Sequence, residues 1–298
     1  SRGEYNLTAS IKRQYTRASL QCNAYETESV EWGHLADEEF TYQDKSDFMA
    51  GEFVWTGFDY LGEPTPYNDV WPSRSSYFGI IDLCGIPKDR YYLYKSKWSN
   101  EKVLHLLPHW NWENGDKVDV HCFTNYDKAE LFLNGKSLGI KEKDPLNLLT
   151  TYRLVWNQVN FESGTLKVVA LNNDNTPIES TTIATAGEPM KIVLSADRNE
   201  IIADGKELVF ITVTVVDENG NVCPRADNLI NFSITGEGEI RAVGNGNPTS
   251  VESFVKPFRK AYNGKCMLII SSTLKKDTFL VKATSEGLHS QTVQVKSN

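Results

Sequence analysis

The sequence predicts a mixed fold, in which an α/β segment is followed by two all-β modules. Residues 1–100 combine helical spacing of apolar residues with short apolar runs. From about Glu101 the apolar residues recur at every second position, and a second series of such runs begins near Met190. A chain of 298 residues is long enough for two or three domains. We therefore expect domains at residues 1–100, 101–188 and 189–298.

The first segment predicts helices on either side of a strand. Residues 31–50, "EWGHLADEEFTYQDKSDFMA", place apolar residues among charges in the manner of an amphipathic helix. Residues 51–55, "GEFVW", predict a short buried strand. Residues 86–98, "IPKDRYYLYKSKW", predict a second helix with Pro87 in its first turn. The order helix, strand, loop, helix indicates α/β architecture with parallel strands.

The remaining two thirds predict two antiparallel sandwiches. Asn134–Gly135 indicates a hairpin with a type I′ turn, because these residues accept the two positive φ angles that this turn needs. Five longer runs after Met190 predict the second module, with a turn at residues 217–220. The runs that predict strands in the first module are "KVDVHCF", "AELFLNG", "GTLKVVAL" and "STTIATAG". Those of the second module are "KIVLSAD", "LVFITVTVVDENGNVC", "INFSITGEG", "CMLIISS" and "TFLVKATSEG".

Composition argues against several classes of function. The formal net charge of −8 and a pI of about 5.3 give no large positive field for a nucleic acid. No run approaches the roughly 20 apolar residues of a membrane-spanning helix, so we expect no membrane insertion. His105 and His109 are four residues apart, but Pro108 between them disfavours a helical zinc site. We expect neither a metal nor a cofactor. Five scattered cysteines predict free thiols: Cys22, Cys84, Cys122, Cys223 and Cys266.

The stretch "GEFVWTGFDYLGEPTPY", residues 51–67, crowds aromatic and acidic side chains beyond the predicted strand. An indole ring such as that of Trp55 can cover the C–H face of a sugar, while carboxylates bind its hydroxyls. A second interpretation places Trp55 and Phe58 in the core, with Asp59 and Glu63 as solvated loop charges. The residues alone leave both interpretations open.

The acidic residues of the first segment mark no catalytic pair by their spacing. Glycoside hydrolysis needs two carboxyl groups about 5 Å apart for retention, or about 6.5–9.5 Å apart for inversion. We interpret most of the eight candidates as charges on a helix face or in a loop. They are Glu26, Glu28, Glu31, Glu38, Glu39, Glu52, Asp59 and Glu63.

Three stretches resemble the family 2 glycoside hydrolases of the β-galactosidase type. Residues 51–67, followed by "SSYFGIIDLCGIPKDRYYLYKSKW", resemble the last strand, loop and helix of the catalytic barrel. "WENGDKVDVHCFTNYDKAELFLNGKSLG" resembles the immunoglobulin-like domain that follows it, and "GEIRAVGNGNPTSVESF" with "RKAYNGKCMLII" resembles a further β-sandwich. The resemblance implies the C-terminal portion of a (β/α)8 TIM barrel followed by two immunoglobulin-like β-sandwich domains.

The resemblance also implies a retaining exo-glycosidase without a cofactor. In this family the nucleophile precedes an "S-S-R-G-E-Y"-like run, and the present chain opens with "SRGEYNL". Both catalytic glutamates are therefore expected upstream of Ser1, and residues 1–298 alone are expected to be inactive. Trp55 matches the tryptophan that walls the sugar site of the family, and Asp59 matches a nearby acidic position.

The segment before Gly79 bears on the sugar. Family β-glucuronidases carry Asn-x-Lys there, and its lysine clamps the sugar carboxylate. This chain has Ser76-Tyr77-Phe78 instead, which favours a neutral sugar, galactose first. Known β-galactosidases place an asparagine where this chain has Phe78, so the identity of the neutral sugar stays open.

The expected partners are a carbohydrate substrate and the remainder of the barrel in the full-length protein, and self-association is open. An open arc of a barrel exposes strand edges and core side chains. Three outcomes follow: the segment folds poorly, packs on the neighbouring sandwich, or is completed by another chain. Because polysaccharide-degrading relatives are commonly exported, we expect a periplasmic or extracellular location.

An alternative function is a non-catalytic carbohydrate-binding or spacer module of a surface protein, because fold does not fix function. Six of the seven tryptophans lie at or before Trp112, so the final module has no tryptophan for a sugar of its own. The long loop at residues 244–265 has two interpretations. It is a packed Ω-like loop, or it shapes the substrate entrance of the barrel.

Overall fold

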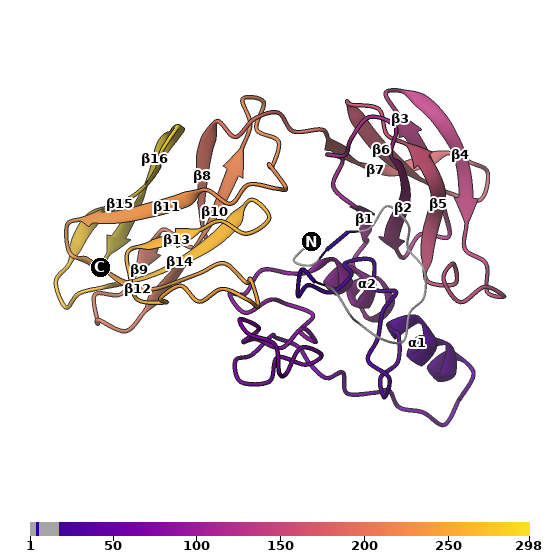
Figure 1. Cartoon of the computed structure of the whole chain (residues 1–298), viewed down its shortest axis with the longest axis horizontal. Helices are drawn as coiled ribbons and strands as arrows, with labels where there is room; N and C mark the ends of the chain where they lie inside the picture. Colours follow the sequence, from indigo (N-terminus) through magenta and orange to yellow (C-terminus); the bar gives the residue numbers. More distant parts are fainter. Residues whose placement is uncertain (1–3, 6–17) are drawn as a thin grey trace. The chain divides into compact units, whose positions relative to one another are not determined.

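A computed structural model describes residues 4–5 and 18–298, and its elements are labelled in Figure 1. Most of the "SRGEYNL" stretch lies outside the described residues. Contacts divide the chain into two compact units, Ser1–Asp82 with Ile86–Thr185, and Leu83–Gly85 with Ala186–Asn298. The described chain is predominantly β, and its sheets form sandwiches.

Helix α1 (Ala36–Asp44) is shorter than the predicted helix over residues 31–50. The Glu38 carboxylate accepts a hydrogen bond from the Leu35 N–H at 3.0 Å, which satisfies one of the free donors at the helix start. Its first turn carries three acidic residues, which interact favourably with the positive end of the helix dipole. Phe40 faces the interior and is fully buried.

Helix α2 (Asp89–Trp98) confirms the predicted second helix, but it begins after Lys88, so the placement of Pro87 in its first turn is wrong. Acidic Asp89 lies in its first turn and Lys95 and Lys97 in its last, so both ends are stabilised by the helix dipole. Leu93 and Tyr94 form its buried face.

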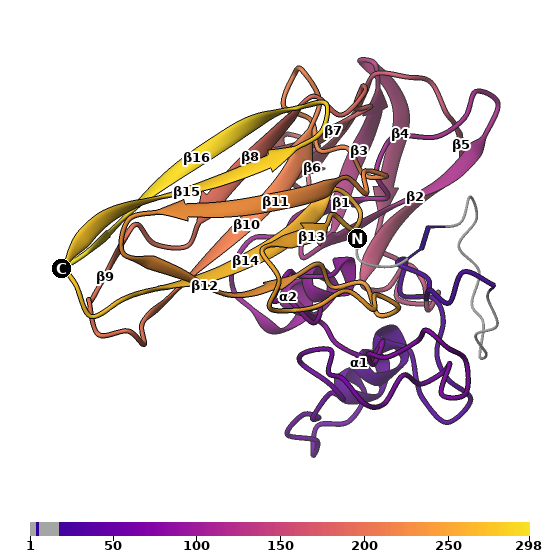
Figure 2. The same cartoon turned by 60° about the vertical axis from the view of Figure 1, so that its left-hand side comes forward.

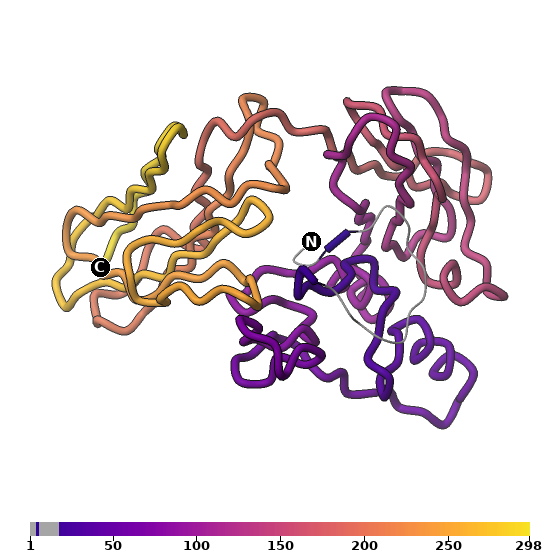
Figure 3. Tube along the Cα trace, viewed as in Figure 1, coloured from indigo at the N-terminus to yellow at the C-terminus, as the bar shows by residue number. Residues whose placement is uncertain are grey.

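The predicted strand at residues 51–55 is wrong, because these residues form an irregular segment in the structure. The tube in Figure 3 shows the chain winding without a regular element between α1 and α2. A parallel strand needs a hydrogen-bonded neighbour along its length. The described part of this segment supplies only single bridges, such as the parallel pair Phe58–Ile81 and the antiparallel pair Leu61–Ser75. The α/β sheet predicted for residues 1–100 is therefore not formed by the described residues.

The first sandwich confirms the predicted strands of residues 101–188 (Figure 1). One antiparallel sheet has the order β1-β2-β5 and the other the order β4-β3-β6-β7. Trp110 and Trp156 lie between the sheets with alternate residues such as Leu131 and Leu166. The strands are β1 (Leu104–Leu107), β2 (Lys117–Thr124), β3 (Lys128–Leu133), β4 (Lys136–Glu142), β5 (Arg153–Asn160), β6 (Thr165–Leu171) and β7 (Pro177–Ala184).

The hairpin between β3 and β4 confirms the predicted turn. Asn134 and Gly135 have φ angles of 50° and 81°, as a type I′ turn requires. The Asn134 side chain also accepts a hydrogen bond from the Thr165 N–H at 2.8 Å, which ties the turn to β6.

The first segment packs on this sandwich, the second of the three expected outcomes. Tyr25 and Phe40 of the segment share a buried cluster with Leu107, Phe123 and Tyr152 of the sandwich. The segment thus buries one apolar face without a complete barrel.

The second unit is a sandwich of nine strands, and Figure 2 shows it from a second direction. Its main order is β12-β14-β10-β8-β16-β15-β11-β13, and β9 pairs with β16. Alternate residues of β10 and β14, including Ile211 and Leu268, fill the core. The strands are β8 (Lys191–Ala196), β9 (Glu200–Ile201), β10 (Leu208–Val216), β11 (Leu229–Thr235), β12 (Gly238–Gly244), β13 (Phe258–Lys260), β14 (Lys265–Ser272), β15 (Asp277–Ser285) and β16 (Leu288–Ser297).

The long loop at residues 244–265 folds around Arg259. The guanidinium donates to the Asn245 side-chain oxygen and to the Ser250 hydroxyl, both at 3.0 Å, and to the Glu252 carbonyl at 3.1 Å. It also lies 5.1 Å from the centre of the Phe254 ring. These contacts match the packed-loop interpretation, while a role at the substrate entrance stays a prediction.

Candidate functional site

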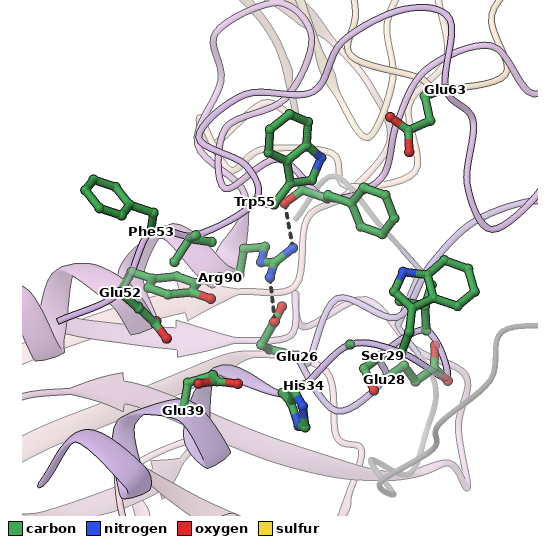
Figure 4. A pocket seen from close by; sticks show the side chains of 16 residues that line it. Glu26, Glu28, Ser29, His34, Glu39, Glu52, Phe53, Trp55, Glu63 and Arg90 are labelled. Carbon is green, nitrogen blue, oxygen red and sulfur yellow. Dashed lines mark hydrogen bonds and ion pairs between the residues drawn. The ribbon is translucent and has the colours of Figure 1, made fainter. Parts of the chain in front are cut away.

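An open pocket of about 390 Å³ lies in the first unit, between α1, α2 and the loops of the first segment. In Figure 4 its acidic side chains surround Arg90, with Trp55 on one side. The loop before α1 contributes Glu26, and the segment between α1 and α2 contributes Glu52 and Phe53. Residues far apart in sequence are brought together here, and no local spacing could have signalled it.

Trp55 lies in the pocket wall and is 69% exposed. Its indole N–H donates to the Tyr60 hydroxyl at 3.0 Å, and that hydroxyl donates to the Glu63 carboxylate. The rings of Trp55 and Tyr60 meet edge to face, at 6.0 Å and 83°. The interpretation of Trp55 and Phe58 as core residues is wrong, because both rings are exposed. The polar residues after Trp55 therefore orient its ring.

Asp59 is buried rather than solvated. Its carboxylate pairs with Lys88 at 2.6 Å and accepts the Gly79 N–H at 2.8 Å. Burial raises the pKa of this carboxyl, and Lys88 opposes the rise. A Cβ at Gly79 would lie 2.2 Å from the Asp59 nitrogen, so only glycine permits this approach. Asp59 is not among the residues that line the pocket, and its role in substrate binding stays a prediction.

Arg90 of α2 links two walls of the pocket. It pairs with the Glu26 carboxylate at 2.8 Å and donates to the Phe78 carbonyl at 2.9 Å, as the dashed lines in Figure 4 show. The Thr56 N–H donates to the same carbonyl at 3.5 Å. The residue that follows Trp55 is thus connected to Glu26 through Arg90 and Phe78.

The pocket is strongly acidic. Glu26 and Glu28 lie in a loop, as expected from the sequence for most of the acidic residues, and both side chains are buried. Burial raises the pKa of Glu52, and the nearby Glu39 carboxylate raises it further. Of the described residues that line the pocket, Arg90 and His34 are the basic ones, and the Arg90 guanidinium pairs with Glu26. The arrangement suits hydroxyl donors and disfavours anions.

Residues 4–5 and 18–298 contain no group of three or more histidine, cysteine or acidic side chains placed to hold a metal ion. In the same residues, no helix has the length and apolar character that crossing a membrane requires.

Comparisons with known proteins assign both sandwiches. Residues 192–294 match the family described as glycoside hydrolase family 2 C-terminal domain 5. Residues 115–178 match a domain of unknown function, DUF4982.

Similar full-length proteins include the β-galactosidase BoGH2A of Bacteroides ovatus, which is 48% identical over 96% of this chain. A putative β-glucuronidase of Formosa agariphila is 33% identical over 72% of the chain. The chain spans 33% and 21% of the length of these two relatives. The crystal structure of a β-glycosidase from Bacteroides vulgatus matches with a TM-score of 0.85 and 29% identity, over 94% of this chain and 34% of that one.

The sandwiches, the acidic pocket with its exposed indole and these matches define the class of the protein, which is that of the glycoside hydrolases. Within that class the chain belongs to family 2.

Proposed function

We propose that this chain is the C-terminal portion of a retaining exo-glycoside hydrolase that acts on terminal β-galactosides or a related neutral sugar. The two catalytic glutamates lie outside residues 1–298 in this proposal. The observation that carries it is the pocket, in which the exposed ring of Trp55 stands beside carboxylates. The 48% identity to a β-galactosidase supports the reaction class.

The charge of the pocket supports a neutral sugar. Glu28, Glu39, Glu52 and Glu63 line it together with the Glu26–Arg90 pair. A uronate would bring a further carboxylate against these groups, and like charges in contact are unfavourable. Sugar hydroxyls instead donate hydrogen bonds to carboxylates while the C–H face of the ring covers Trp55.

Kinetics of the full-length gene product test this proposal. We expect hydrolysis of nitrophenyl β-galactoside to exceed that of the matching β-glucuronide, and Trp55→Ala to lower kcat/KM about tenfold or more, equal to about 1.4 kcal/mol. Phe210→Ala, at an exposed ring of β10, is the control. Turnover by residues 1–298 alone would contradict the placement of the catalytic glutamates. Preference for the glucuronide would overturn the neutral sugar, and galactan binding without hydrolysis would support the alternative of a binding module.

We also propose that residues 1–100 are the last part of a (β/α)8 barrel, and that residues 101–188 and 189–298 are immunoglobulin-like domains. Exposed apolar side chains of the first segment support this, among them Phe48 and Trp71 at 90% and 76% exposure. The remainder of the barrel, in the same full-length chain, covers part of this surface. Hydrogen exchange tests the proposal: amides of residues 46–58 should be better protected in the full-length protein than in residues 1–298 alone. Equal protection would contradict it.

A periplasmic or extracellular location completes the proposal, since polymeric sugars are met outside the cytoplasm. Fractionation of the source cells with an activity assay tests it. Self-association of the full-length protein is a separate expectation, which light scattering measures.

A further inference from the structure

We infer that Arg153 is a positioning residue through which the first sandwich holds the sugar pocket in shape. Arg153 begins β5, outside the residues that line the pocket. The inference rests on the proposed function for its kinetic readout, and on the geometry alone for the physical coupling.

The guanidinium of Arg153 is fully buried, and its hydrogen bonds reach out of the sandwich. It donates to the Tyr25 carbonyl at 2.6 Å and to the Glu26 carbonyl at 3.3 Å. It binds both carboxylate oxygens of Asp37 in α1, one of them at 3.1 Å. Within its own sandwich it stacks over the Phe123 ring, at 4.9 Å from the ring centre. The Arg153 side chain therefore holds both the loop at residues 25–26 and the start of α1.

The contacts continue from this loop into the pocket. The Glu26 carbonyl is held by Arg153, while the Glu26 carboxylate holds Arg90 at 2.8 Å. Arg90 in turn donates to the Phe78 carbonyl, which also accepts the Thr56 N–H. A displacement of the loop at residue 26 therefore moves the partner of Arg90, and with it the support of the chain at Trp55.

Only arginine fits this position. Its planar group supplies several donors in fixed directions, whereas lysine offers a compact ammonium that cannot bind a carboxylate and two carbonyls with the same geometry. A lysine keeps a positive charge beside the buried Asp37 carboxylate. The Arg153→Lys variant therefore tests the positioning of the loop without leaving a buried charge unpaired.

A purely structural role makes a different prediction. If Arg153 only stabilised the fold, Arg153→Lys would lower the unfolding midpoint while the folded fraction kept its KM. If Arg153 acts through Glu26 and Arg90, KM rises and the effect does not add to that of Glu26→Gln, because both changes break the same chain of contacts.

The experiment uses the full-length protein with Arg153→Lys, Glu26→Gln and the double variant, assayed on nitrophenyl β-galactoside. We expect each single change to raise KM about fivefold to tenfold with kcat altered less than about twofold, and the double variant to match the singles. Ile211→Val, at a fully buried core residue of the other unit, should leave KM unchanged. Unchanged KM in folded Arg153→Lys, or additive effects, would overturn the inference.

Two further measurements keep the test decisive. Should Arg153→Lys fail to fold, Phe123→Leu removes the ring that lies against the guanidinium and retains the hydrogen bonds of Arg153. It should raise KM about twofold, while Phe279→Leu, at a fully buried ring of the other unit, should leave KM unchanged. Should the wild-type protein hydrolyse no glycoside, the proposed function fails, and hydrogen exchange decides the coupling alone. Arg153→Lys should then speed exchange at residues 25–30 and 54–58 together. Faster exchange at residues 25–30 only would overturn the coupling.

Discussion

Two regions of the molecule are each organised around a buried arginine, and they differ in the range of its partners. Arg259 is satisfied inside its own loop, by residues 7 to 14 positions away. Arg153 is satisfied by residues 116 to 128 positions away. Both guanidiniums also lie over a phenylalanine ring. The same side chain therefore builds a local loop in one unit and joins two segments of the chain in the other.

The difference teaches how the first segment keeps its structure. Among the described residues of the segment, two helices and single bridges are the regular features, and many apolar rings are exposed. Its order depends on contacts with the sandwich, above all the Tyr25–Phe40–Phe123 cluster and Arg153. The loop around Arg259 has its support within a complete β-sandwich.

The largest expected effect is that of Arg153→Met. Asp37 would be left buried without its cationic partner, which typically costs about 3–5 kcal/mol. We expect loss of hydrogen-exchange protection across residues 18–45 with little change in residues 191–298. Unaltered protection of α1 would break the comparison.

A smaller and local effect is expected for Arg259→Met. Its acidic partner Glu252 is partly exposed, so water can solvate that carboxylate when the guanidinium is removed. The expected cost is about 2 kcal/mol, from lost hydrogen bonds to a charged group. Protease cleavage within residues 244–258 should appear while β10 and β14 stay protected. A general loss of protection in the second unit would show that the loop is not local.

The two regions should also differ in their response to pH. Burial, aided by the Arg153 charge, holds the pKa of His121 well below its ordinary value of 6.5. Below about pH 6.5 the unfolded chain binds a proton on this imidazole and the folded protein does not. The free energy of unfolding therefore falls as the pH is lowered, with a slope that approaches about 1.4 kcal/mol per pH unit. His121→Phe should remove this slope, measured by urea unfolding between pH 5.5 and 7.5. The second unit contains one histidine, the exposed His289, and no buried imidazole.

The smallest effect concerns the orientation of Trp55, whose partners are local. Tyr60→Phe removes the acceptor of the indole N–H and its link to Glu63. The loss of about 1 kcal/mol corresponds to roughly a fivefold rise in the KM of the full-length protein for the proposed substrate. Because Arg153 does not act through Tyr60, this effect should add to that of Arg153→Lys. Tyr42→Phe, at an exposed ring of α1, is the matched control.

Much of the β architecture could be predicted from the sequence. Alternation of apolar residues identified β2, β3, β6 and β7 of the first sandwich and β8, β10, β11, β14 and β15 of the second, and Asn134–Gly135 identified the β3–β4 turn, because these signals are local. The runs did not mark β1, β5, β9, β12, β13 or β16. The strand at residues 51–55 was predicted wrongly from its apolar composition. Strand formation depends on neighbours, and the described residues around this segment provide single bridges only.

The pocket was predicted in part. The aromatic and acidic stretch at residues 51–67 predicted that Trp55 lies in a sugar site, and the structure places this residue in the pocket wall. Glu26 was grouped with the charges of helix faces and loops, and neither Arg90 nor Arg153 was marked, because each partner lies in a distant segment. Pairing of this kind is set by tertiary structure and leaves no spacing in the sequence.

Two of the four acceptors of Arg153 are main-chain oxygens, those of Tyr25 and Glu26. A hydrogen bond to a backbone carbonyl does not depend on the side chain of that residue. The backbone path of the loop therefore matters for these two contacts, and the identity of its side chains does not. A chimeric enzyme that takes its sandwich from a relative should therefore stay intact if the donor strand begins with arginine and α1 retains Asp37. Sequence similarity at other positions between the first segment and the sandwich would be a poor guide in choosing the relative that supplies the sandwich.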